Sequence, residues 1–425
     1  MNKKLKINLR VVVFHTVRFF IKLYRFFILL CISKRINRIT NNSKYCFLKD
    51  QEPLTEEEYE IAKNVCQHIR HMLSIRNDFI DKKGMDPEIH MPRANWSADK
   101  GFNRLTERIL SSDKMIINHL RLFSQIFTGY SLVWQYKKEG IPLLDDVPKD
   151  LDSDILKRRN PKQKEILLYC DALKKLPEEL CLSLPNKFGE IGYLINGKIV
   201  NFDAYVYLER VVLMYEANVI NELIQLEKAG KTPVILEIGA GYGGLAYFLK
   251  KLLPRSRYII VDIPESLVFS AIYLSILFKD QKNVLFENTG SDLTCEGPGF
   301  TFLSNYLFDE ILKSGIKFDL VINTLSMSEM SENQIRYYCE GIRSKLKDNG
   351  VFFEQNLDIR HIGFQNAQSI IREYFPWHMR VFSNILLLIT QGTPNIWSIN
   401  SYKKRYHYNP KFIFKLRNII LNSIF

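Results

Sequence analysis

The stretch that decides the fold reads Val-Ile-Leu-Glu-Ile-Gly-Ala-Gly-Tyr-Gly-Gly-Leu and occupies residues 234–245. An apolar run of strand type leads directly into a glycine-rich segment, 239–244, and a helical pattern follows over 243–253. Glycine lets a ligand approach the main chain closely, and the first turn of a helix offers unpaired N–H groups. The stretch therefore predicts a site for a polar or anionic ligand at the carboxyl end of a strand.

Strand and helix patterns alternate on both sides of this stretch. The strand candidates are VILEI (234–238), YIIVDI (258–263), NVLFEN (283–288), FDLVINT (318–324) and GVFFEQN (350–356), and the helix candidates are 243–253, 265–279 and 332–347. Two more apolar runs, 380–382 and 385–390, could close the sheet as a hairpin. Continuously apolar strands that alternate with helices are typical of a parallel sheet covered on both faces. We therefore predict an α/β fold with a Rossmann-like sheet over 231–395.

The region 50–230 is predicted to form a largely helical N-terminal domain that covers the cleft and helps to select the substrate. Its helix candidates are 54–75, with a capping box at Thr55 and Glu58, then 116–130, and a long helix over 203–229 that ends at Gly230. Asn196-Gly197 is a strong signal for a two-residue hairpin turn.

The net charge of +13 is concentrated at the two ends of the chain. Residues 1–49 carry twelve Lys or Arg and no acid, and residues 401–425 carry six more, which leaves about −5 for residues 50–400. A nucleic-acid enzyme is expected to spread basic surface over its working domain. The charge distribution therefore argues against a nucleic-acid partner.

The apolar run at 11–32 is interrupted by Arg18, Lys22 and Arg25, which share one narrow stripe of a helix. Three central basic residues offset the apolar gain of insertion, so the sum for spanning a bilayer is near zero or unfavourable. A basic amphipathic helix prefers a membrane interface, or it docks on the protein with its stripe in water. Both alternatives stay open for segment 1–49 and for the basic C-terminal tail, 396–425. The expected location is cytoplasmic, with peripheral contact to the anionic inner face of the cytoplasmic membrane in the first case.

Two acidic residues narrow the choice of ligand. Glu237 lies two residues before the first glycine, and the spacing G-x-G-x-G-G differs from the dinucleotide fingerprint G-x-G-x-x-G. A carboxylate there would repel a pyrophosphate, whereas it suits the cationic sulfonium and amino group of S-adenosylmethionine. Asp262 ends the next strand, where an acid can accept both hydroxyls of a ribose; the alternative role is a helix-entry residue.

The E-x-G-x-G-x-G pattern resembles the first motif of class I methyltransferases. Together with VDIPESL (261–267) and FDLVINTLSMSEM followed by IRYY (318–338), it resembles the sugar O-methyltransferases of bacterial surface-glycan clusters, most strongly over 231–356. The resemblance implies a class I methyltransferase sheet, S-adenosylmethionine as the cofactor, and methyl transfer to a hydroxyl of a nucleotide-activated or lipid-linked sugar. It does not extend to the first 49 residues.

The predicted site residues follow from the glycine loop and from the strand ends that line such a cleft. The predicted cofactor-binding residues are Glu237, Gly239, Ala240, Gly241, Tyr242, Gly243, Asp262, Ile263, Asn323 and Thr324. A sugar hydroxyl is a poor acid, so a general base is expected. The catalytic candidates are Glu329 and His361, followed by Glu354 and Asp358, and Asn356 could bind a sugar hydroxyl. No metal is predicted.

Two other classes of function stay open at this point. A nicotinamide-dependent oxidoreductase would use the same glycine loop, and a non-catalytic membrane-associated scaffold would keep only the fold. The identity of the sugar, its carrier and the oligomeric state do not follow from the sequence.

Overall fold

The computed structural model describes residues 34, 44–46, 52–93, 96, 101–124, 127, 163–190, 192–287, 293, 297–358, 365–386, 389 and 392–400. The predicted amphipathic helix at 11–32 and the tail from residue 401 lie outside the described residues. Within the described part of the chain, no helix is both long enough and apolar enough to cross a membrane.

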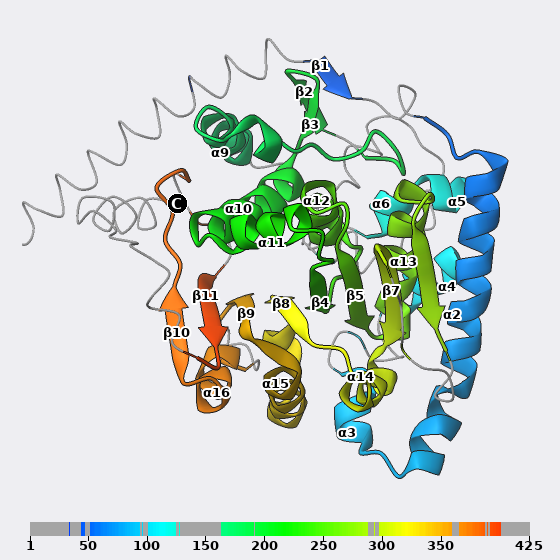
Figure 1. Ribbon diagram of the computed structural model, residues 1–425. Helices are drawn as coiled ribbons and strands as arrows, with labels where there is room; N and C mark the ends of the chain where they lie inside the picture. The colour runs from blue at the N-terminus through cyan, green and yellow to red at the C-terminus, as the bar shows by residue number, and fades with distance from the viewer. Residues whose placement is uncertain are drawn as a thin grey trace, which may run out of the picture.

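The centre of the molecule is an eight-stranded, mostly parallel sheet (Figure 1). In order across the sheet, the strands are β10 (Trp377–Arg380), β11 (Thr393–Ser398), β9 (Leu346–Asn356), β8 (Phe318–Thr324), β4 (Val234–Ile238), β5 (Arg257–Asp262), β7 (Gly299–Ser304) and β6 (Lys282–Phe286). The strands from β9 to β6 are parallel, and β11 and β10 add an antiparallel edge. The predicted α/β class is confirmed.

Helices cover the sheet on both faces. The described helices are α2 (Glu56–Lys83), α3 (Pro87–His90), α4 (Gly101–Leu110), α5 (Lys114–Asn118), α6 (Leu120–Phe123), α9 (Gln163–Leu173), α10 (Phe202–Glu216), α11 (Val219–Lys228), α12 (Gly244–Leu252), α13 (Pro264–Leu277), α14 (Phe308–Lys313), α15 (Glu332–Lys345) and α16 (Ala367–Tyr374), with 3-10 turns η5 (Glu178–Leu180), η6 (Asn305–Leu307) and η7 (Ser326–Glu329). A separate small sheet contains β1 (Lys44–Cys46) and the hairpin β2 (Gly192–Ile195) and β3 (Lys198–Val200), whose predicted Asn196-Gly197 turn is confirmed.

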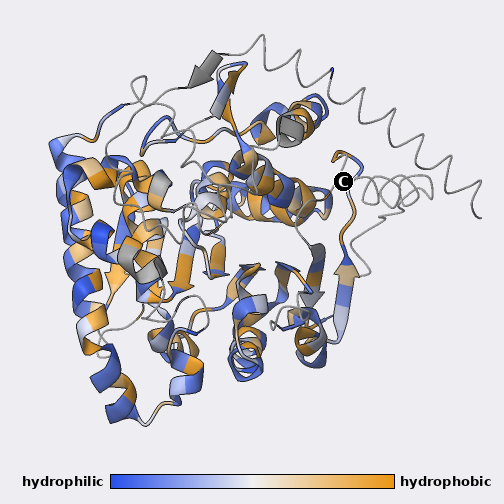
Figure 2. Cartoon of the chain, turned by 180° about the vertical axis from the view of Figure 1, so that it is seen from behind, coloured by the Kyte–Doolittle hydropathy of each residue, from blue (hydrophilic) through white to orange (hydrophobic). Residues whose placement is uncertain are grey.

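Side chains of successive strand residues point to opposite faces, and this alternation divides the core in two. Ile235 and Ile260 belong to a cluster with α2, α4, α10, α12 and α13, whereas Leu236 and Ile259 pack with α14, α15 and α16 (Figure 1). The helical region before residue 231 thus shares one core with the sheet. Figure 2 shows the consequence: the strands are mainly hydrophobic, and the outer side of α2 is hydrophilic.

One strand of the sheet was not predicted, and the predicted closing hairpin is wrong. The sequence GFTFLS, now β7, was not among the strand candidates, yet it lies between β5 and the predicted NVLFEN strand. The closing hairpin consists of β10 and β11, not of 380–382 and 385–390. Between these two runs, the Glu216 carboxylate accepts hydrogen bonds from the Ser383 hydroxyl and from the Asn384 amide.

Predicted helix boundaries also need correction. The expected single helix over 203–229 is divided into α10 and α11 at Asn218, whose φ of 61° is left-handed. Asparagine tolerates this conformation better than most residues, so the chain turns there while both segments stay packed. The expected helix at 116–130 is broken at His119 into α5 and α6. The capping box of α2 at Thr55 and Glu58 is confirmed.

Candidate functional site

A cavity lies at the carboxyl ends of β4, β5 and β8, where parallel α/β sheets usually bind ligands. Its volume is about 140 Å³, and most of its lining comes from the following parts of the chain. These are the glycine loop after β4, the end of β5, the turn η7 after β8, and a cover from 91–93, Trp96, Phe127 and α10. The sheet and the helical region therefore both contribute to it.

The glycine loop is held against the two neighbouring strand ends. The Gly239 amide donates to the Val261 carbonyl at 2.8 Å, and the Gly241 amide donates to the Asp262 carboxylate at 3.1 Å. Gly239 has a φ of +74°, and a Cβ there would lie 2.2 Å from the Ser326 hydroxyl oxygen. Glycine is therefore required at residue 239 both by conformation and by contact with η7. Gly239, Ala240 and Gly241, which are predicted from the sequence to bind the cofactor, all line the cavity.

Glu237 reaches the cavity from within β4 and is only 2% exposed. Its carboxylate accepts a hydrogen bond from the Tyr258 hydroxyl at 2.6 Å. Burial raises the pKa of Glu237 to about 7, partly offset by the Tyr258 hydrogen bond and by the nearby Arg210 guanidinium. The carboxyl group is thus poised to ionise fully when a cationic ligand approaches.

Asp262 ends β5 and lines the cavity from the next strand. Its carboxylate accepts from the Gly241 amide, from the Ser266 hydroxyl at 2.9 Å and from the Ile263 amide at 2.9 Å. Burial raises the pKa of Asp262 to about 7. A carboxylate has about four lone-pair sites, so Asp262 retains acceptor capacity toward the cavity. Ile263, another predicted cofactor-binding residue, also lines the cavity.

The two predicted residues at the end of β8 have different positions. Thr324 lines the cavity, whereas Asn323 is fully buried and does not. The Asn323 side chain donates to the Ile238 carbonyl at 2.8 Å and accepts from the Asn356 amide group at 3.0 Å. Asn323, which was predicted to face the ligand, thus lies outside the lining of this cavity, because alternate strand residues point to opposite faces.

Tyr242 and Gly243 also do not line the cavity. The Tyr242 ring points below the loop, fully buried, with the Arg121 guanidinium carbon 3.8 Å from its centroid. Gly243 has a φ of +86° and begins α12; a Cβ there would meet Leu274 at 2.9 Å. Tyr242 therefore fills space beneath the loop.

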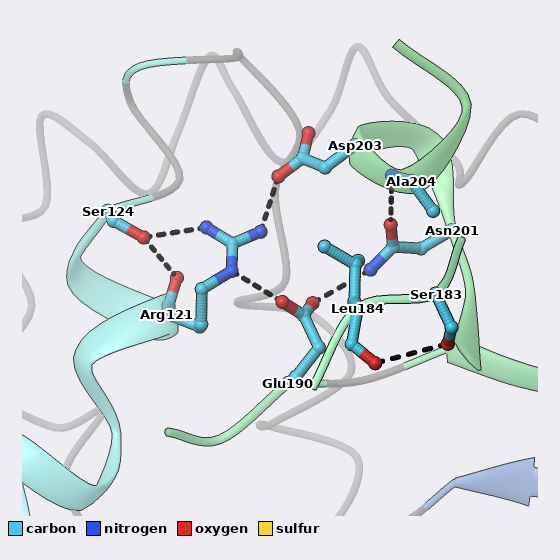
Figure 3. A network of polar contacts seen from close by, with 8 residues as sticks. All are labelled: Arg121, Ser124, Ser183, Leu184, Glu190, Asn201, Asp203 and Ala204. Carbon is cyan, nitrogen blue, oxygen red and sulfur yellow. Dashed lines mark hydrogen bonds and ion pairs between the residues drawn. The ribbon is translucent and has the colours of Figure 1, made fainter. Parts of the chain in front are cut away.

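Arg121 connects this part of the loop to a buried polar network (Figure 3). Its guanidinium donates to the Glu190 carboxylate at 2.6 Å, to the Ser124 hydroxyl at 2.7 Å and to the Asp203 carboxylate. Asn201 donates to the other Glu190 oxygen at 2.8 Å. Burial raises the pKa of Glu190. The network fixes α6 and the start of α10 beneath the glycine loop.

Glu329 lies in the cavity at the end of η7. Its carboxylate accepts a hydrogen bond of 2.5 Å from the Trp96 indole N–H, and burial raises its pKa. The Trp96 ring stacks on Phe127 with centroids 5.7 Å apart. Phe127 in turn lies against Gly241, where an added Cβ would meet its ring at 3.1 Å. An aromatic pair thus covers the glycine loop and orients Glu329.

The remaining base candidates do not line the cavity or are not described. His361 lies outside the described residues and stays a prediction. Glu354 is fully buried on the opposite face, where it accepts from Asn356, Asn395 and Trp397. Asn356 is buried in the same network. Asp358 is exposed and accepts from the Asn366 side chain at 3.2 Å.

Sequence reasoning did not name any residue of α10 for the site. Tyr207 and Arg210 line the cavity, although neither was among the predicted site residues. A charged pair, Glu209-Arg210, inside an otherwise apolar helix is the signal that could have indicated them. Other unpredicted lining residues are Ser266, Asn305, Gln334 and Tyr338. Among the described residues, no group of three or more His, Cys, Asp or Glu side chains could hold a metal ion.

No protein-family model matches the chain, and no curated protein matches it. Similar solved structures include human methyltransferase-like protein 13 in complex with SAH, with 13% identity, 51% of this chain and 89% of that chain covered, and a TM-score of 0.28. An S-adenosylmethionine-dependent methyltransferase from Clostridium acetobutylicum is 19% identical, with 35% and 50% covered and a TM-score of 0.24. An amino pentose methyltransferase from Micromonospora echinaspora, with S-adenosylmethionine bound, is 13% identical, with 34% and 50% covered and a TM-score of 0.23. At these TM-scores the likeness does not decide the function of this chain.

Proposed function

We propose that this chain is an S-adenosylmethionine-dependent O-methyltransferase that acts on a sugar hydroxyl of a nucleotide-activated or lipid-linked surface glycan. The observation that carries the proposal is a pair of carboxylates, the buried Glu237 and the half-buried Asp262, near the ends of adjacent parallel strands on one cavity. A glycine loop lies between them and bonds to Asp262 through the Gly241 amide. This arrangement suits a ligand that carries both a positive charge and vicinal hydroxyls.

The groups in the cavity fit S-adenosylmethionine in their polar chemistry. In this proposal Glu237 faces the cationic methionine end, and Asp262 accepts hydrogen bonds from the ribose hydroxyls. The volume of about 140 Å³ is below the roughly 300–1,000 Å³ of most ligand sites. Side chains at the border of the cavity therefore have to shift when the cofactor binds.

Bound S-adenosylmethionine would supply an electrophilic methyl group on its sulfur. The protein has to hold the acceptor oxygen in line with that methyl, and positioning of this kind contributes about 7–11 kcal/mol. Glu329 is the proposed base that takes the proton of the acceptor hydroxyl, which adds about 10²–10⁴-fold to the rate. Its raised pKa improves its basicity, and the Trp96 hydrogen bond holds it in place.

The choice of a sugar as acceptor is supported by the sequence resemblance and by the surroundings of Glu329. An aromatic ring, Trp96, lies beside it, and amide side chains from Asn305 and Gln334 line the same cavity. Sugars present apolar faces and hydroxyl edges, which such a surface can bind. His361 remains a second candidate for the base.

The test is incubation with labelled methyl donor and a panel of nucleotide sugars and glycan extracts, followed by mass spectrometry. A methylated sugar is expected from the wild type, and Glu329→Gln should reduce kcat about 10²–10⁴-fold without weakening cofactor binding. Asp358→Asn is the matched control, because it makes the same kind of change outside the cavity. Calorimetry with S-adenosylmethionine and NAD completes the test: tight NAD binding without a response to the methyl donor would favour an oxidoreductase.

We also propose that the basic segment 1–49 holds the enzyme at the inner, anionic face of the cytoplasmic membrane. Its twelve basic residues support the proposal, since each Lys or Arg near such a surface contributes about 1 kcal/mol. Release from the membrane fraction by high salt, or by deletion of residues 1–45, is the expected result. A protein that stays in that fraction under both treatments would contradict electrostatic attachment.

A further inference from the structure

Arg210 is a buried cation for which the proposed chemistry has so far given no role. It lies on α10 with 4% of its surface exposed, and it lines the cavity beside Tyr207 and Glu237. Its guanidinium carbon lies 5.5 Å from the centroid of the Tyr207 ring. The sequence of α10 places it two residues after Leu208 within an apolar helix, so the charge is not at a solvated surface.

The guanidinium group of Arg210 lacks hydrogen-bond and ion-pair partners among the described residues. Its Nε is buried without a hydrogen-bond partner. Within the described residues, its guanidinium forms no hydrogen bond and no ion pair. Burial lowers the pKa of Arg210 from its ordinary value, because nearby acids offset only part of the loss of hydration.

Arg121 shows how this chain treats a buried arginine with a structural role. It is also buried, but it donates to two carboxylates and a hydroxyl. An unpaired buried charge costs several kcal/mol, and native proteins usually pair it. The contrast indicates that the partner of Arg210 is an anionic group that enters the cavity.

The neighbouring charge narrows the identity of that group. Glu237 lines the same part of the cavity and already accepts from Tyr258. Within the described residues Arg210 and Glu237 form no ion pair with each other, although each charge is close enough to act on the other. A cation and an anion that face one cavity separately match a ligand with both an ammonium and a carboxylate, which is the chemistry of an α-amino acid.

We propose that Arg210 binds the α-carboxylate of the methionine portion of S-adenosylmethionine, while Glu237 binds its ammonium group. This inference rests on the proposed function. The inference adds to the proposed function a specific cofactor contact made by a residue of the N-terminal helical region. Arg210 is a binding residue here, because the guanidinium contacts the cofactor and not the acceptor.

The test is isothermal titration of wild type and Arg210→Met with two ligands, S-adenosylhomocysteine and 5′-methylthioadenosine. The second keeps the adenosine and the thioether but lacks the amino acid. Arg210→Met should reduce the affinity for S-adenosylhomocysteine about 10- to 150-fold, which is the range expected for the loss of hydrogen bonds to a charged group. Its affinity for methylthioadenosine should stay within about two-fold, and this arm also shows that the variant is folded. Arg210→Lys keeps the charge and should recover part of the loss.

Three results would overturn the inference. If Arg210→Met loses affinity for both ligands equally, Arg210 only supports the fold of the cavity. Unchanged affinity for both, together with a raised KM for the acceptor, would mean that the anion belongs to the acceptor. If wild type binds methylthioadenosine and S-adenosylhomocysteine equally well, the amino acid is not recognised at all. Failure of the proposed function is distinct, because wild type would then bind neither ligand.

Discussion

Replacing Glu237 by Gln should stabilise the ligand-free protein at high pH, although it should weaken ligand binding in the cavity. The folded state raises the pKa of this carboxyl from 4.5 to about 7. A carboxyl whose folded pKa is raised contributes stability below its unfolded pKa, and that contribution is lost as the pH rises through 7. Because one pKa unit corresponds to 1.36 kcal/mol, the ionised group costs the folded state about 3 kcal/mol at pH 8.

Glutamine does not titrate, and its side-chain oxygen can still accept the hydrogen bond of the Tyr258 hydroxyl. We therefore compare the free energy of unfolding of Glu237→Gln with that of the wild type at two pH values. The variant's advantage should be about 2 to 3 kcal/mol larger at pH 8 than at pH 5. Asp262 titrates in both proteins, so its contribution largely cancels in the difference. Urea denaturation at the two pH values measures the effect.

Glu332→Gln is the control, because it makes the same change at the exposed start of α15, where a surface ion pair contributes little. It should show no comparable difference between the two pH values. The reasoning is refuted if Glu237→Gln changes the stability equally at pH 5 and pH 8. The same variant should lose affinity for S-adenosylhomocysteine, since a residue that costs stability and is kept in a cavity is expected to serve binding.

Three further perturbations test separate parts of the site. Tyr258→Phe removes a hydrogen bond that favours ionised Glu237, so cofactor affinity should fall several-fold at pH 7 and recover at pH 9 in calorimetric titrations; a pH-independent loss would contradict this. Arg121→Met leaves two buried carboxylates without their cation and should cost about 3–5 kcal/mol in urea denaturation, whereas a loss below about 1 kcal/mol would show that the network is not needed. Trp96→Phe keeps an aromatic ring but removes the N–H that favours ionised Glu329, so the acidic limb of the kcat profile should move to higher pH. An unmoved limb would exclude Glu329 as the base.

Most of the sheet could be predicted from the sequence, because buried parallel strands are read from continuous apolar runs. The strands β4, β5, β6, β8 and β9 were all recognised in this way. The strand β7 was missed although Gly297-Pro298-Gly299 before alternating Phe and Thr residues is a usual strand signal. The turn at Asn218 was also missed, because a helical stripe continues through it without interruption.

The site was predicted only as far as local sequence defines it. Glu237, Asp262 and the glycine loop form a pattern within thirty residues of chain, so their meeting at one cavity could be foreseen. Thr324 lines the cavity and Asn323 does not, because their side chains point to opposite faces of the sheet. That choice depends on the register of β8 in the folded sheet.

The sequence by itself determined the α/β class, the glycine loop and the two strand-end carboxylates, because each of these is encoded by residues close together in the chain. Only the tertiary structure decided that α10 brings Arg210 to Glu237 and that Trp96 reaches Glu329. The Trp96–Glu329 contact joins residues 233 positions apart. No local pattern records such a pair, since it exists only when the helical cover packs on the finished sheet.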